Sequence, residues 1–139
     1  MKLTLAGLSK FDFLGVLFLR LGTGSLIAYH GFPLLVGGTD GYERIGGPVA
    51  LIGISSFHLV FGLASAVIQA VGGLFLILGI LTRSIALLLT VIAGFAIANL
   101  IHHSAEIDTA LLVHIQVCLA LLSLVFIGPG RFSLDRKGI

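Results

Sequence analysis

The feature that most constrains this chain is a series of long apolar stretches separated by short polar breaks. A helix needs about 20 mostly apolar residues to cross the hydrocarbon core of a membrane. Of the 139 residues, 58% are hydrophobic and only 10% are charged, whereas soluble domains average about 25% charged residues. The chain is therefore an integral membrane protein. The predicted spans are residues 13–36, 57–81, 84–102 and 109–128.

The breaks between these spans differ in character. Residues 37–47, "GGTDGYERIGG", are polar and rich in glycine, and they predict a turn. Residues 48–56 are apolar but would make the second span too long, so we expect a re-entrant or interfacial piece sheltered by protein. Thr82 and Arg83 predict a tight turn. The expected fold is an all-α, integral membrane four-helix bundle with this short segment after the first helix, forming one domain over residues 1–139.

Basic residues predict the orientation, because short cytoplasmic loops carry an excess of lysine and arginine. Four spans leave only Arg44 on one side of the membrane. The opposite side receives Lys2, Lys10, Arg83, Arg131, Arg136 and Lys137. Both termini are therefore expected in the cytoplasm.

Several function classes lack support in the sequence. The net charge is only +2, and there is no basic patch with interleaved aromatics, no Walker loop and no GxGxxG, so we expect no nucleic-acid partner. Cys118 is the only cysteine, which excludes an intrachain disulfide and a cysteine-rich zinc or iron–sulfur site.

Small residues predict where the helices touch, because close backbone approach drives helix association in lipid. The chain has 19 glycines. Small residues four apart occur at Gly24 and Ala28, at Gly94 and Ala98, and at Gly62, Ala66 and Ala70. The spacing of His58, Gly62, Ser65, Gln69 and Gly72 also places a polar stripe on one face of the second span, which we expect to point inward.

All five histidines fall in the outer half of the predicted topology. They are His30, His58, His102, His103 and His114. Histidine tolerates interfaces, so this gathering has a structural as well as a functional interpretation. His102 or His103 with Glu106 has a spacing suited to zinc, iron or copper, but any polar loop can produce it, and we favour no metal. A bis-histidine haem is geometrically allowed but usually needs deeper histidines.

Arg20 is the one charged residue placed inside a span. An intramembrane charge usually faces the bundle, a cavity or a partner. Gln69 is the strongly polar side chain expected at similar depth. Three interpretations remain open. The arginine snorkels to the headgroups, it holds an anionic or carbonyl-bearing ligand, or it binds a carbonyl at a broken helix.

Three stretches together resemble the DoxX family of small membrane proteins. They are "LRLGTGSLIAYHGFPLL", "QAVGGLFLILGILTRSIALLL" and "GPGRFSLDR". The resemblance implies a compact four-helix bundle in a bacterial or archaeal cytoplasmic membrane, linked in some members to quinone-coupled sulfur oxidation, redox-stress defence or terminal-oxidase complexes. Residues that match the family pattern are Arg20, His30, Gly31, Gly72, Gly73, Arg83, Gly128, Gly130 and Asp135. The chain departs from it at Gln69, often a glutamate, and at Leu34, often a lysine, which weakens proton-coupled chemistry.

The sequence favours two functions. The first is a small component of a redox or respiratory system that binds a quinone-like or other lipophilic molecule, with Arg20, His30, His58 and Gln69 as hydrogen-bond donors. Phe32 and Phe57 are candidate stacking walls. The second is a structural or assembly subunit of a larger membrane complex, or a homo-oligomer. A small-solute permease is a third alternative, which would need an oligomer.

Overall fold

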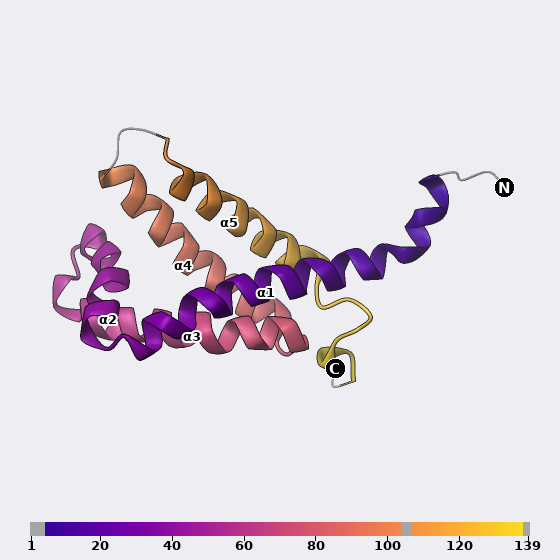
Figure 1. The fold of residues 1–139 in the computed structure, drawn as a ribbon, viewed down its shortest axis with the longest axis horizontal. Helices are drawn as coiled ribbons and strands as arrows, with labels where there is room; N and C mark the ends of the chain where they lie inside the picture. The colour runs from indigo at the N-terminus through magenta and orange to yellow at the C-terminus, as the bar shows by residue number, and fades with distance from the viewer. Residues whose placement is uncertain (1–4, 104–106, 138–139) are drawn as a thin grey trace.

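The computed structural model describes residues 5–103 and 107–137 (Figure 1). Within this part the elements are all helical, and four of the helices are long and apolar enough to cross a membrane. The fold class predicted from the sequence is thus confirmed. In chain order the elements are η1 (Leu5–Phe11), α1 (Asp12–Val36), α2 (Thr39–Gly46), η2 (Gly47–Ile52), η3 (Ser55–Phe57), α3 (His58–Leu78), α4 (Thr82–His103), α5 (Thr109–Ile127) and η4 (Leu134–Lys137).

The helices α1 and α3 form the closest pair, and Figure 1 shows them side by side. Their backbones touch where glycines leave room. A Cβ atom added at Gly24 would lie 2.7 Å from the carbonyl oxygen of Gly73, and one added at Gly31 would collide with the backbone of Ala70. Such close approach is how helices associate in lipid. Most small residues were thus correctly predicted to be contacts, whereas Gly94 and Ala98 are exposed.

The remaining spans, α4 and α5, form a hairpin that joins the first pair mainly at one end. We call this the inner end, and the first and last described segments, indigo and yellow in Figure 1, lie on its side. The buried core that joins the hairpin to α1 and α3 lies toward it and consists of Ile27, Leu76, Ala86, Leu89, Leu121 and Leu124. Toward the opposite, outer end the hairpin diverges from α1 and α3 (Figure 1). In α5 only Leu121 and Leu124 are buried.

Two local predictions were wrong. Residues 39–46 form the helix α2 instead of a plain turn, because its glycines let it lie against α3. A Cβ at Gly46 would collide with the carbonyl of His58, and one at Gly62 would collide with the carbonyl of Tyr42. The turn between α3 and α4 comes before Thr82, at residues 79–81. Gly79 takes the left-handed conformation there with φ 73°, which glycine adopts without steric penalty.

The close contact at Gly31 leads to a stability prediction. Replacing Gly31 with alanine should lower the stability by about 1–3 kcal/mol, because backbone atoms of Ala70 occupy the space that the methyl group needs. Gly22 lies on the same helix with nothing within 4 Å of an added Cβ. Gly22→Ala should therefore be neutral or stabilise by up to about 1 kcal/mol. Thermal unfolding in detergent measures both, and equal effects would contradict the assigned α1–α3 interface.

Candidate functional site

The side chain of Arg20 is buried at the inner end of the bundle and is only 1% exposed. Its Nε donates to the carbonyl of Leu76 at 3.0 Å, and its Nη2 donates to that of Ile77 at 2.9 Å. Its Nη1 donates to the carbonyls of Pro129 and Phe132, both at 2.6 Å. Four of the five N–H donors of the guanidinium are thereby used on backbone oxygens.

These partners explain why a charge can be buried here. Leu76 and Ile77 lie in the last turn of α3, where carbonyls lack partners within the helix and carry partial negative charge. Gly79 N–H satisfies only the carbonyls of Phe75 and Leu76. Arg20 therefore caps the end of α3 and ties it to the segment after α5. Of the interpretations left open by the sequence, this geometry matches the carbonyl at a helix end.

The depth of Arg20 also differs from the prediction. It lies level with the end of α3, whereas Gln69 is seven residues, or about 10 Å, further into that helix. The expectation that the two side chains share one depth was therefore wrong. The first two turns of α1 extend past the end of α3, which moves Arg20 toward the membrane boundary.

The C-terminal segment provides a matching contact for α4. The carboxylate of Asp135 accepts hydrogen bonds from the backbone N–H groups of Leu81 (2.6 Å) and Thr82 (2.8 Å), and the N–H of Asp135 donates to the carbonyl of Gly79 at 3.0 Å. A carboxylate at the start of a helix compensates its free N–H groups and its dipole. Burial would raise the pKa of Asp135, but these hydrogen bonds and the charge of Arg20 outweigh it and lower the pKa.

Gly79 is part of the same junction. Its left-handed backbone has no room for a side chain, because an added Cβ would collide with the guanidinium of Arg20 and lie 2.6 Å from Cβ of Ser133. We use the name inner-end junction for Arg20, Gly79, Asp135, Pro129 and Phe132. Sequence reasoning treated Arg20 alone and gave the others no common role. The signal that could have linked them is the "GPGRFSLDR" stretch, in which two glycines and a proline are followed by Asp135.

His30 and Gln69 form a second polar contact, one that crosses from α1 to α3. Nδ1 of His30 lies 2.9 Å from Oε1 of Gln69. His30 is exposed and Gln69 is half-buried. Gln69 is close to the middle of α3, eleven residues from its start and nine from its end. The pair therefore lies near the centre of the candidate span.

The helical period shows which side the pair faces. Ile27 and Leu76 belong to the core shared with α4 and α5. His30 is three residues from Ile27 and Gln69 is seven residues from Leu76, and both spacings keep a side chain on nearly the same helix face. The pair thus continues the hairpin-facing side toward the outer end, where α4 and α5 diverge (Figure 1).

The other predicted site residues lie elsewhere. His58 begins α3, about 16 Å along the helix from Gln69. His102 and His103 line a pocket of about 620 Å³ with Asn99 and with residues of η2. Glu106 lies outside the described residues. Among the residues described, no three histidine, cysteine, aspartate or glutamate side chains are placed to hold a metal ion.

Comparison with known proteins gives one match. The DoxX family model matches residues 15–104, which is more than half of the chain. The chain belongs to the DoxX family. No curated protein and no solved structure matches it.

The matched region contains Arg20, the His30–Gln69 pair and Gly79, whereas Asp135 lies beyond its end. In this DoxX protein, hydrogen bonds nonetheless join the C-terminal segment to the matched region. Arg20 donates to the carbonyl of Pro129, and Leu81 N–H donates to Asp135. That the whole chain forms a single domain stays a prediction, supported by these contacts between α1, α3 and the C-terminal segment.

Substitution of Arg20 should be strongly destabilising. Arg20→Leu removes the hydrogen bonds to four backbone carbonyls, of which only that of Leu76 keeps another donor, the N–H of Gly79. Hydrogen bonds to a charged group contribute about 1.5–3 kcal/mol each, so we expect a loss of more than about 3 kcal/mol. Arg20→Lys should restore only part of it, because an ammonium lacks the planar fork. Arg44→Leu, an exposed arginine of α2, is the control. Thermal unfolding in nanodiscs that gave similar stabilities for both leucine variants would contradict the junction.

Asp135 should contribute a pH-dependent part of the stability. The pKa of Asp135 is lowered in the folded chain. Its contribution to the free energy of unfolding is therefore complete at pH values above the pKa in the unfolded chain, about 3.9, and disappears as the pH falls through the pKa in the folded chain. Asp135→Ala should cost about 1–2 kcal/mol at pH 7, as loss of a helix cap does. The difference from the native protein should shrink below about pH 4. Unfolding of both proteins across pH 3–7 measures this, and a difference that stayed constant would contradict it.

Proposed function

We propose that this DoxX protein is a small component of a membrane redox system that binds a quinone-like molecule at the His30–Gln69 pair. The observation that carries the proposal is the 2.9 Å contact between His30 Nδ1 and Gln69 Oε1. The amide oxygen can only accept, so Nδ1 is the donor in this contact, and in the neutral imidazole with its proton on Nδ1 the other nitrogen, Nε2, is an acceptor. The amide N–H groups of Gln69 remain as donors. The pair thus presents one acceptor and two donors on one side of the bundle.

This combination suits an oxygen that changes between carbonyl and hydroxyl. A carbonyl accepts a hydrogen bond from the Gln69 amide, whereas a hydroxyl can also donate to Nε2 of His30. Polar groups near the centre of a span are costly in hydrocarbon unless they find partners. A lipophilic ligand with such an oxygen would supply this partner, and its apolar part would lie in the surrounding membrane. Arg20 is left out of this site because its donors are used within the inner-end junction.

A second function, a non-catalytic assembly subunit, is favoured by a different observation. The helices α4 and α5 leave most of their surfaces exposed, and only three residues of α4 and two of α5 are buried. A larger membrane protein or a second copy would find a long apolar surface there. A permease would need an oligomer, because four short helices leave little room for a pore in one copy.

The proposed location is a bacterial or archaeal cytoplasmic membrane with both termini in the cytoplasm. Its support is the charge asymmetry of the loops, which leaves Arg44 as the one basic residue outside. The inner-end junction would then lie on the cytoplasmic side and His102 and His103 on the outer side. A reporter fused after Ile139 that was active only outside the cytoplasm would contradict this orientation.

Binding of a short-chain quinone to the purified protein tests the leading proposal. We expect Gln69→Leu to weaken binding about tenfold, the equivalent of ~1.4 kcal/mol, because the carbonyl loses its donor. Gln116→Leu is the matched control, since Gln116 is an exposed glutamine near the middle of α5. The measurement is the shift in thermal unfolding as the quinone is titrated.

Two results of this titration would contradict the proposal. Equal binding by the Gln69→Leu variant would move the ligand away from the pair. Absence of binding by the native protein, with a larger membrane protein recovered by cross-linking through α4 or α5, would favour the assembly subunit instead.

A further inference from the structure

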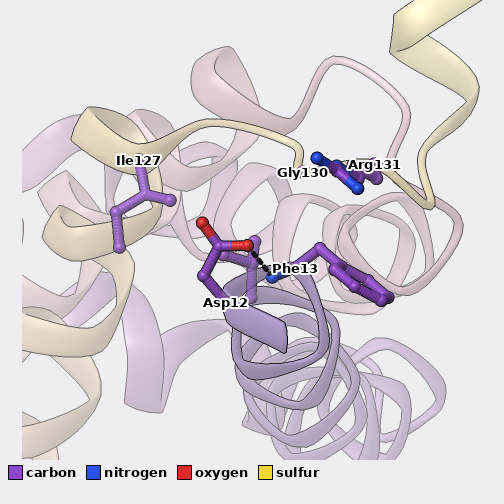
Figure 2. Close-up of a pocket in the computed structure, with 6 residues that line it drawn as sticks. Asp12, Phe13, Ile127, Gly130 and Arg131 are labelled. Carbon is purple, nitrogen blue, oxygen red and sulfur yellow. Dashed lines mark hydrogen bonds between the residues drawn. The ribbon is translucent and has the colours of Figure 1, made fainter. Parts of the chain in front are cut away.

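The inner end of the molecule carries a pocket that the proposed function does not use. It has a volume of about 230 Å³ and is lined by Asp12, Phe13, Val16, Ile127, Gly130 and Arg131. Asp12 begins α1 and Ile127 ends α5, so the pocket lies where the apolar spans meet the polar boundary of the membrane. Figure 2 shows the carboxylate of Asp12 on the side of Ile127 and the side chain of Arg131 beside Gly130.

The two charged side chains of this pocket, Asp12 and Arg131, do not pair with each other. Oδ1 of Asp12 accepts from the N–H of Phe13 at 2.6 Å (Figure 2), and the guanidinium of Arg131 lies 5.4 Å from the ring centre of Phe13. No ion pair joins Asp12 and Arg131 in the described part of the chain. One carboxylate and one guanidinium thus face a shared space whose remaining walls include the apolar side chains of Phe13, Val16 and Ile127.

From this arrangement we infer that the pocket binds the headgroup of a zwitterionic phospholipid that carries a primary ammonium, as in phosphatidylethanolamine. The phosphate contacts the guanidinium of Arg131, and the ammonium donates to the carboxylate of Asp12. The pocket has the volume of about eight water molecules at ~30 Å³ each, which admits such a headgroup. The acyl chains would continue along the apolar surfaces of α1 and α5.

The charges of the pocket favour phosphatidylethanolamine over phospholipids with other headgroups. A choline headgroup has no N–H to donate to Asp12, so it loses the hydrogen bond at that end. A glycerol headgroup has no cation, so its net negative charge faces the carboxylate of Asp12 without compensation. The ring of Phe13 packs against that of Phe132, with ring centres 5.5 Å apart, and gives the pocket an apolar wall beside its two charges.

Lipid binding to the purified full chain tests the inference. Phosphatidylethanolamine, phosphatidylcholine and phosphatidylglycerol with identical acyl chains are titrated into the protein in detergent and followed by thermal unfolding and by native mass spectrometry. We expect half-saturation by phosphatidylethanolamine at about tenfold lower concentration than by the other two, the effect of one charge-assisted hydrogen bond. Equal half-saturation by phosphatidylcholine or phosphatidylglycerol would overturn the inference.

Variants locate the effect in the pocket. Asp12→Asn keeps the acceptor for Phe13 N–H but removes the charge, and Arg131→Gln removes the opposite charge. Each should raise the half-saturating concentration about tenfold. Lys10→Gln, which changes an exposed charge two residues before Asp12, should leave the half-saturating concentration unchanged. A preference that survives both pocket variants, or soluble phosphoethanolamine that displaces the lipid at equal concentration, would overturn the inference.

Discussion

The bonds of Arg20 to four backbone carbonyls hold the inner end of this DoxX protein together. A buried guanidinium is tolerated because two of its partners are carbonyls in the last turn of α3 and the others belong to the segment after α5. Asp135 completes the arrangement from the same segment by accepting from the first N–H groups of α4. One cation and one anion thereby satisfy two opposite helix ends and connect α1, α3, α4 and the C-terminal segment.

The helices are joined at the inner end, and the outer end is arranged differently. The buried core lies near the junction, and beyond it the α4–α5 hairpin diverges from α1 and α3 (Figure 1). The polar contact of His30 with Gln69 lies on that side, and His30 is exposed, so the ligand site that we propose there is separate from the junction. The inner-end pocket with Asp12 and Arg131 lies on the same end of the molecule as the junction, and a lipid bound there would anchor this end at the membrane boundary.

The sequence predicted the parts of this structure that depend on composition and period. Apolar length predicted four spans, and the spacing of Gly62, Ala66 and Ala70 predicted a buried helix face. It did not predict the partners of Arg20, because Pro129 and Phe132 are more than a hundred residues away and contribute only backbone oxygens, which no side-chain pattern encodes. The helix α2 was missed for a related reason. Its glycines were taken as turn formers, whereas Gly46 and the facing Gly62 permit contact with α3.

The most direct test of the account is solid-state NMR of the protein in phospholipid bilayers, with ¹⁵N in the arginine side chains and ¹³C in the carbonyls of Pro129 and Phe132. The account predicts strong ¹⁵N–¹³C dipolar coupling between the Arg20 guanidinium and both carbonyls, since Nη1 lies 2.6 Å from each oxygen. It also predicts no coupling of that guanidinium to lipid ³¹P. Coupling to ³¹P without coupling to the carbonyls would mean that Arg20 reaches the headgroups, and the junction would be refuted.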